Sequence, residues 1–150
     1  MLANDVLRRI RYIFNYNDQK MIDIFNSGGL KVSLIEVAQW LKKDEDSEFK
    51  KMNDLSLAHF LNGLINEKRG KKEGVILVPE KTLTNNIILR KLTIALNLKS
   101  EDTIKILGDA DLRVSKHELS AFFRKPDHKH YRECLDQILR NFLIGLEGKF

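Results

Sequence analysis

The sequence predicts an all-α protein of two tandem four-helix units, related by a pseudo-twofold axis and packed into one globule. Apolar residues recur at helical spacing along the chain, and only two prolines occur in 150 residues. A shift of 82 residues aligns positions 4–68 with 86–150 without a gap, and 17 of the 65 pairs are identical. A unit of that size buries a modest core alone, so we expect the two units to pack together.

The first helix of each unit is expected to begin at an asparagine, because asparagine is a preferred N-cap. Asn4 has this position in the first unit and Asn86 in the second. One face of each helix is apolar and should be buried: Leu7, Ile10 and Phe14, matched by Leu89, Leu92 and Leu96.

The second helix is short and starts near Asp18 in one unit and Ser100 in the other. In the first unit it should stop at Gly28-Gly29, since glycine favours helix ends. The second unit has Gly108 followed by 109–111, of sequence Asp-Ala-Asp, so we expect its turn to be built differently. The apolar residues of the pair are Met21, Ile22, Ile24 and Phe25, matched by Thr103, Ile104, Ile106 and Leu107.

The third helix opens with a capping box in both units, Ser33 with Glu36 and Ser115 with Glu118. In this motif the serine accepts from the amide three residues on, and the glutamate accepts from the serine amide. The next apolar positions should form a buried stripe, and Trp40 and Phe122 are interpreted as core residues rather than ligand-stacking groups. The stripe comprises Val37, Trp40 and Leu41, matched by Leu119, Phe122 and Phe123.

The fourth helix is expected to start at Asp54 or Asp136 as N-cap. Gly63 and Gly145 lie within its apolar stripe, where glycine costs about 1 kcal/mol relative to alanine. Their recurrence predicts the close approach of another backbone, with the fourth helix of the other unit as the expected partner. The stripe comprises Leu57, Phe60, Leu61 and Leu64, matched by Leu139, Phe142, Leu143 and Leu146.

These elements divide the chain into a helical unit at 1–68, a linker at 69–85 and a second helical unit at 86–150. Glycines and Pro79 break helix in the linker. Residues 75–78 are too apolar for a free linker, and we expect them to lie extended against the body.

Composition limits the classes of function. The net charge is +5 and the pI about 9.3, but the excess is spread along the linker and second half rather than gathered on one face. A single cysteine, Cys134, excludes an internal disulfide and forms no zinc pattern. No apolar run reaches the length of a membrane span and no signal-peptide layout occurs, so we expect a cytoplasmic protein with no membrane contact.

No phosphate loop, nucleophile elbow, metalloprotease motif or paired-carboxylate arrangement is present, so we predict no catalytic residue, cofactor or metal. Asp127, His128, His130 and Cys134 gather near one helix start, but the first unit has no histidine or cysteine at the same positions. We interpret them as surface histidines and a half-buried thiol. The duplicated charges are interpreted as caps, with Arg8 and Arg90 pairing with one of the capping acids.

The sharpest functional hypothesis is a helix-turn-helix made by the second and third helices. It would place Lys42 and Lys43, or Arg124 and Lys125, on a groove-facing surface, together with Gln39 or His117. Against it, the turn from Gly28 to Ser33 is long and an acidic run follows the first copy. The further candidate cations for nucleic acid or a partner lie at the end of the fourth helix: Arg69, Lys71 and Lys72.

Five segments of the chain together match the pattern of a known family. They are Asn4-Asp5-Val6-Leu7-Arg8-Arg9, residues 60–71 (Phe-Leu-Asn-Gly-Leu-Ile-Asn-Glu-Lys-Arg-Gly-Lys), residues 85–92 (Asn-Asn-Ile-Ile-Leu-Arg-Lys-Leu), Pro126-Asp127-His128-Lys129 and Arg132-Glu133-Cys134. With these segments the chain resembles the YehS-like family of small bacterial proteins, a duplicated domain of unknown function. Where the family pattern has a glycine after Arg-Glu-Cys, this chain has Leu135. The resemblance implies a bacterial cytoplasmic protein and supplies no activity.

The leading functional hypothesis is therefore a non-enzymatic interaction module with an unknown protein partner, because the duplication carries no catalytic constellation. The alternative is a nucleic-acid-binding regulatory protein, favoured by the pI and the helix pair. A duplicated small-ligand or regulatory domain is the third possibility.

Overall fold

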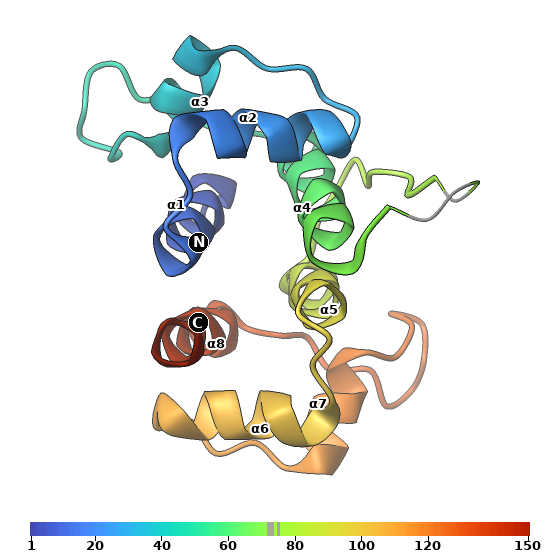
Figure 1. The fold of residues 1–150 in the computed structure, drawn as a ribbon. Helices are drawn as coiled ribbons and strands as arrows, with labels where there is room; N and C mark the ends of the chain where they lie inside the picture. Colours follow the sequence, from blue (N-terminus) through green and yellow to red (C-terminus); the bar gives the residue numbers. More distant parts are fainter. Residues whose placement is uncertain (72–73, 75) are drawn as a thin grey trace. The chain divides into compact units, whose positions relative to one another are not determined.

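The described residues form α-helices joined by turns and loops, with no strand, which confirms the all-α prediction (Figure 1). A computed structural model describes residues 1–71, 74 and 76–150. None of the helices in these ranges is both long and apolar enough to cross a membrane. The helices are α1 (Ala3–Phe14), α2 (Asp18–Ser27), α3 (Leu34–Leu41), α4 (Asp54–Arg69), α5 (Asn85–Ala95), α6 (Ser100–Asp109), α7 (Lys116–Phe122) and α8 (Asp136–Lys149).

The chain divides into two compact units, Met1–Thr82 with α1 to α4 and Leu83–Phe150 with α5 to α8. The starts of α5 to α8 follow those of α1 to α4 by the same 82 residues. Left-handed backbone recurs with the same offset, at Asn15 (φ 52°) and Asn97 (φ 54°). The two halves of the sequence therefore encode one local structure twice.

Each core is centred on the last helix of the unit. In unit 1, α4 packs against α2 and α1, and in unit 2, α8 packs against α6 and α5. The predicted stripes of α4 and α8 are completely buried, as are the first two predicted positions of α1 and α5. Val37, Leu119 and Phe122 are buried as expected, whereas Trp40 is half-buried with its ring 5.4 Å from that of Phe25.

The glycines inside α4 and α8 do meet another backbone, but the predicted partner was wrong. A Cβ on Gly63 would lie 1.9 Å from the carbonyl oxygen of Ile24, which belongs to α2 of the same unit. A Cβ on Gly145 would lie 2.2 Å from the carbonyl oxygen of Ile106 in α6. The close contact is therefore made within each unit, between its second and fourth helices.

Asn4 and Asn86 are buried tethers rather than N-caps, which corrects the sequence-based expectation. The Asn4 side chain donates to the carbonyls of Trp40 and Lys50 (2.9 and 2.8 Å) and accepts from the Met52 amide (2.9 Å). Asn86 makes the three corresponding bonds in unit 2. Each asparagine thereby holds the end of the third helix and the loop after it against the first helix.

The helix starts differ from the prediction in two further places. The α4 N-cap is Asn53, whose side chain accepts from the Ser56 amide, and α8 begins after Leu135. The predicted caps Asp54 and Asp136 are instead the first helical residues, where a negative charge favours the helix dipole. Both predicted capping boxes, at Ser33 and Ser115, are confirmed.

The turn after the second helix is built in the same way in both units, contrary to expectation. Asp111 adopts left-handed backbone (φ 62°) at the position where unit 1 has Gly29 (φ 91°). The amides of Gly29 and Asp111 donate to carbonyls at equivalent positions, Asn26 and Gly108. Aspartate is one of the few residues with a side chain that tolerate this conformation, so it can replace glycine here.

The linker does not bury its apolar side chains as expected. Ile76 is 87% exposed and Val78 is 78% exposed, whereas Pro79 and Glu80 are half-buried. Val75, which belongs to the same predicted stretch, lies outside the described residues. The apolar character of this segment is therefore not explained by packing on unit 1.

Candidate functional site

Most of the net positive charge of the protein lies on the surface around α7 in unit 2. Residues 113–132 contain six lysines and arginines against two acids, a net of +4, and three histidines. The aligned residues 31–50 of unit 1 contain four lysines against five acids, a net of −1. The exposed cations of this segment are here called the basic surface of unit 2: Arg113, Lys116, Arg124, Lys125, Lys129 and Arg132.

Backbone hydrogen bonds fix the segment that presents these cations. The Arg132 amide donates to the Ala121 carbonyl (3.1 Å), and Asn86 donates to the carbonyls of Phe122 (2.9 Å) and Arg132 (2.8 Å). Buried Leu119 and Phe122 anchor α7 to the core of the unit. The end of the loop after α7, drawn in orange in Figure 1, is thus hydrogen-bonded to the buried side chain of Asn86.

Two depressions flank α7. The larger, of about 660 Å³, lies between the end of α6 and the start of α7 and is lined by Arg113 and Lys116 with Asp111 and Glu118. The smaller, of about 180 Å³, lies on the side of the returning loop and is lined by the polar residues His117, Glu118, Lys129, His130, Tyr131 and Arg132. Both are open and include charged side chains in their lining, which suits an extended charged ligand better than an enclosed small molecule.

Glu118 is the main acid within this surface. The Ser115 amide donates to the Glu118 carboxylate, and this bond, with a side-chain contact to Ser115, lowers the pKa of the carboxyl; nearby Arg132 and His117 act in the same direction. Its carboxylate lies 3.7 Å from the Arg132 guanidinium. Glu118 is therefore occupied in capping α7 and offsets only part of the positive charge.

His128 and His130 extend the surface beyond the lysines and arginines. Their ring centroids are 5.6 Å apart, and the His130 amide donates to Nδ1 of His128 (3.0 Å). The described residues contain no group of three or more histidine, cysteine or acidic side chains arranged to hold a metal.

The corresponding surface of unit 1 has different chemistry. Leu34 and Ile35 on α3 are 53% and 69% exposed at the positions of Lys116 and His117. An acidic run, residues 44–48, follows α3 at the positions that in unit 2 hold Pro126, Asp127, His128, Lys129 and His130.

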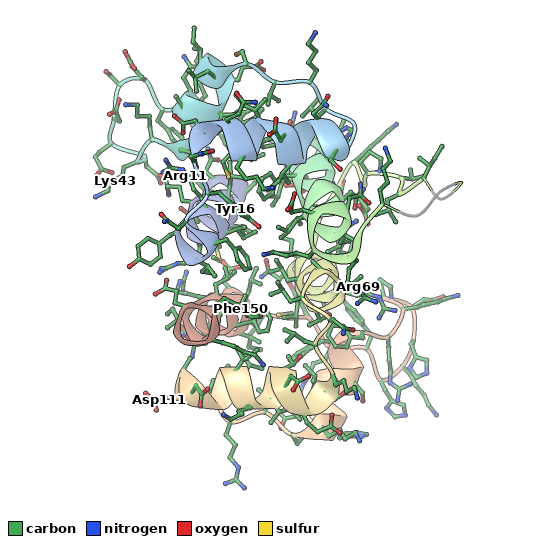
Figure 2. All side chains as sticks on the ribbon, viewed as in Figure 1. Arg11, Tyr16, Lys43, Arg69, Asp111 and Phe150 are labelled. Atoms are coloured by element: carbon green, nitrogen blue, oxygen red, sulfur yellow. The ribbon has the colours of Figure 1, made fainter. Side chains whose placement is uncertain are left out.

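The residues predicted as contacts fall in both units. Arg124 and Lys125 belong to the basic surface of unit 2, whereas Lys43 is exposed on the loop after α3, as Figure 2 shows. Lys42 is half-buried, and Arg8 donates to its carbonyl. Arg69 and Lys71 are exposed at the end of α4, and Lys72 lies outside the described residues.

Four cations of the basic surface were missed by the sequence reasoning: Arg113, Lys116, Lys129 and Arg132. The signal that could have found them is the charge difference between aligned segments of the two units. Counting charge over halves of the chain dilutes this difference, because acids elsewhere in unit 2 offset the local excess.

Within the part of the chain that the structure describes, the duplicated arginines do not pair with the predicted capping acids, which corrects that expectation; the acid that Arg8 meets, Asp5, accepts from the Leu2 amide at the start of α1. Arg8 forms an ion pair with Asp5 on its own helix, and its guanidinium lies 3.7 Å from the carboxylate of Asp44. Arg90 lies over the ring of Phe123, 5.8 Å from the centroid. Cys134 is completely buried rather than half-buried, and burial, with Asp136 and Glu133 nearby, raises its pKa to about 12.

The fold and the site together define a class of all-α proteins in which one four-helix scaffold occurs twice with different surface chemistry. The chain belongs to the family described as protein of unknown function (DUF1456), whose model matches residues 3–70 and again 85–149. It is similar to the uncharacterized protein YehS of Escherichia coli strain K12, with 45% identity over 150 residues, or 99% of this chain and 96% of that protein. No solved structure matches the chain significantly.

Proposed function

We propose that this protein is a non-enzymatic interaction module that binds nucleic acid through the basic surface of unit 2. The observation that carries the proposal is the net charge of +4 over residues 113–132, with six exposed lysines and arginines. Arg113 precedes α7, Lys116 begins it, and the other four lie on the loop after it, whose end is bonded to buried Asn86. Cations held on a fixed backbone can contact several phosphates of one strand without a large loss of conformational entropy.

The contact is expected to follow the phosphate backbone rather than the base sequence. The helix α7 has seven residues, and its capping glutamate and buried stripe leave Lys116, His117 and Ser120 exposed. Sequence readout requires several side chains that reach base edges in a groove. The mixture of lysines, arginines and histidines here suits phosphate contacts, which are independent of sequence and sensitive to salt.

The aligned residues of unit 1 give the proposal a matched control. The pair Lys42-Lys43 aligns with Arg124-Lys125, but an acidic run follows it directly. Removing the unit 2 pair should therefore weaken binding, whereas removing the unit 1 pair should change it little.

The test is fluorescence anisotropy with labelled mixed-sequence DNA and RNA oligonucleotides over a series of salt concentrations. For Arg124→Gln with Lys125→Gln, the slope of log affinity against log salt should fall by about 1.4 to 1.8 if both residues contact phosphate. Lys42→Gln with Lys43→Gln should leave the slope unchanged. Absence of binding at low salt, or equal effects of the two double variants, would overturn the proposal.

A second candidate function is a protein contact on α3 of unit 1. It is favoured by the exposure of Leu34 and Ile35, two apolar side chains on a helix whose unit 2 counterparts are Lys116 and His117. Leu34→Lys with Ile35→His copies those counterparts onto unit 1. If α3 binds a protein, this variant should remain folded and lose a stoichiometric partner that the original chain retains from a bacterial lysate. Retention of the partner by the variant would exclude α3 as the contact.

A further inference from the structure

Unit 1 has a pocket of about 410 Å³ at the junction of α1, the turn after it and the end of α3. Its volume lies in the range of small-molecule sites, roughly 300–1,000 Å³. The pocket is lined by Arg8, Arg11, Tyr12, Asn15, Tyr16 and Leu41. Two arginines and two tyrosines therefore line one hollow, which brings hydrogen-bond donors and aromatic rings together.

We infer that this pocket binds a small phosphorylated ligand that carries a planar ring, and that a nucleoside monophosphate has the required chemistry. The inference concerns a different surface from the basic surface of unit 2 and does not depend on nucleic-acid binding there.

The duplication shows which pocket residues the fold itself requires. Arg8 and Asn15 have identical counterparts, Arg90 and Asn97, as expected for residues that support the scaffold. The other four lining residues do not: Arg11, Tyr12, Tyr16 and Leu41 correspond to Thr93, Ile94, Leu98 and Phe123. Unit 2 adopts the same helix pattern with those residues, so the arginine and tyrosines are not needed to build the helices.

The aligned residues of the two units also explain why unit 1 has space for this pocket. In unit 2 the larger Phe123 stands in the position of Leu41, and the Arg90 guanidinium lies over its ring at 5.8 Å. In unit 1 the Arg8 guanidinium instead bonds to Asp5 and to the Lys42 carbonyl, and Leu41 is smaller than phenylalanine. The hollow in unit 1 is thus bounded by an arginine that is already fixed in position.

Arg11 is the arginine of the pocket whose N–H donors are least used by other residues of the protein. Its guanidinium makes one long contact, 3.5 Å to the carboxylate of Asp18. Its Nε atom is buried and has no hydrogen-bond partner among the described residues. The Arg11 side chain is 42% exposed, so its terminal nitrogens, rather than the covered Nε, can meet an anion in the pocket. A guanidinium presents donors in a planar fork that matches two oxygens of a phosphate.

Tyr16 lines the same pocket as Arg11, and Figure 2 shows both residues near the junction of α1 and α2. The Tyr16 hydroxyl is buried and has no partner among the described residues. Burial, with Glu67 nearby, raises its pKa to about 12, so at neutral pH the hydroxyl keeps its proton. Because this oxygen is closed to solvent, Tyr16 contributes its ring to the pocket wall rather than a donor to the ligand. Its ring is stacked on Phe14 with centroids 5.4 Å apart, which restricts its movement.

Tyr12 is the residue on which a planar ring of the ligand would stack. It lines the pocket yet is 71% exposed, so its aromatic face is open to solvent at the rim. A planar ring on the ligand could stack on this face while its phosphate reaches Arg11, and such stacking tolerates different bases. Asp5, Asp18 and Asp44 offset part of the positive charge, which favours a single phosphate over a polyphosphate.

The test is isothermal titration calorimetry of the full chain with the four common nucleoside monophosphates, inorganic phosphate and guanosine as separate probes. At least one monophosphate should bind, at least tenfold more tightly than phosphate or guanosine alone. Arg11→Thr and Tyr16→Leu copy the unit 2 residues, and each should weaken binding at least tenfold. Tyr12→Ile, a change at an exposed position, is the variant to use if the other two fail to fold by circular dichroism. Lys105→Gln, at an exposed position on α6, is the control that should bind normally.

Several outcomes would overturn the inference. These are the absence of heat with every monophosphate at millimolar concentration, and unchanged affinity in folded pocket variants. If phosphate alone binds as tightly as a monophosphate, the pocket does not recognise a ring, and the assignment of a nucleoside monophosphate is wrong. Loss of monophosphate binding in Arg124→Gln with Lys125→Gln would place the ligand on unit 2 instead. If monophosphates bind but oligonucleotides do not, this inference stands and the proposed function fails.

Discussion

Replacing Gly63 by alanine should force α4 away from α2 and destabilise unit 1. The added methyl carbon would lie 1.9 Å from the carbonyl oxygen of Ile24 and 2.8 Å from its carbonyl carbon. Both are backbone atoms, so no side-chain rotation can relieve the overlap. Because ordinary contact begins at 3.4 Å, the two helices would have to separate by up to about 1.5 Å at this point (3.4 minus 1.9).

The expected magnitude follows from two opposing effects. Alanine is a better helix former than glycine by about 1 kcal/mol. Overpacking of a well-packed core costs about 1–3 kcal/mol, and the present clash lies at the upper end because it involves two backbones. We therefore expect the free energy of unfolding of unit 1 to fall by about 2 kcal/mol.

Urea unfolding followed by tryptophan fluorescence can measure this loss. Trp40 is the only tryptophan of the chain, and its ring lies 5.4 Å from that of Phe25 in the core of unit 1. Its signal therefore reports on the unit that contains Gly63. Gly108→Ala is the control, because a Cβ at Gly108 in α6 would have no neighbour within 4 Å.

The control variant should be as stable as the original chain, or more stable by up to about 1 kcal/mol, when followed by circular dichroism. A Gly63→Ala midpoint equal to or above that of the original chain would show that α2 and α4 can separate without cost. Backbone contact with α2 would then not be the reason for a glycine at position 63.

Two further predictions concern buried groups. Asn4→Ala removes all three bonds to the Trp40 and Lys50 carbonyls and the Met52 amide. Leaving the buried Met52 amide unpaired costs about 1–3 kcal/mol, and the two partly buried carbonyls cost less, so the stability of unit 1 should fall by about 2–3 kcal/mol in the same urea assay. A loss smaller than about 1 kcal/mol would show that these three bonds do not hold the loop against α1. Cys134, with its pKa raised to about 12 by burial, should react with iodoacetamide at pH 8 far more slowly in the folded protein than in urea. Since an unfolded thiol loses its proton near pH 9, the contribution of Cys134 to stability should decline as pH rises from 9 to 12, and Cys134→Ala should flatten that decline.

Local sequence determined the helices and their spacing. The capping boxes at Ser33 and Ser115 and the apolar stripe of α4 were predictable because each depends on residues three or four positions apart. The duplication was equally visible, since an ungapped alignment needs no structure. Of the candidate contacts, Arg124 and Lys125 could be selected from sequence, although their neighbours on the basic surface were overlooked.

Other features depend on residues that are distant in sequence, and the tertiary structure alone decided them. Asn4 resembles an N-cap locally, but its partners lie 36 to 48 residues away. The contact of Gly63 with Ile24 and the gathering of Arg11, Tyr16 and Leu41 around one pocket likewise depend on how helices cross. Propensity and capping act within a turn or two of chain, so they fix where helices begin and end. Which backbones and side chains then meet is decided by packing, where one buried asparagine or one missing Cβ selects the arrangement.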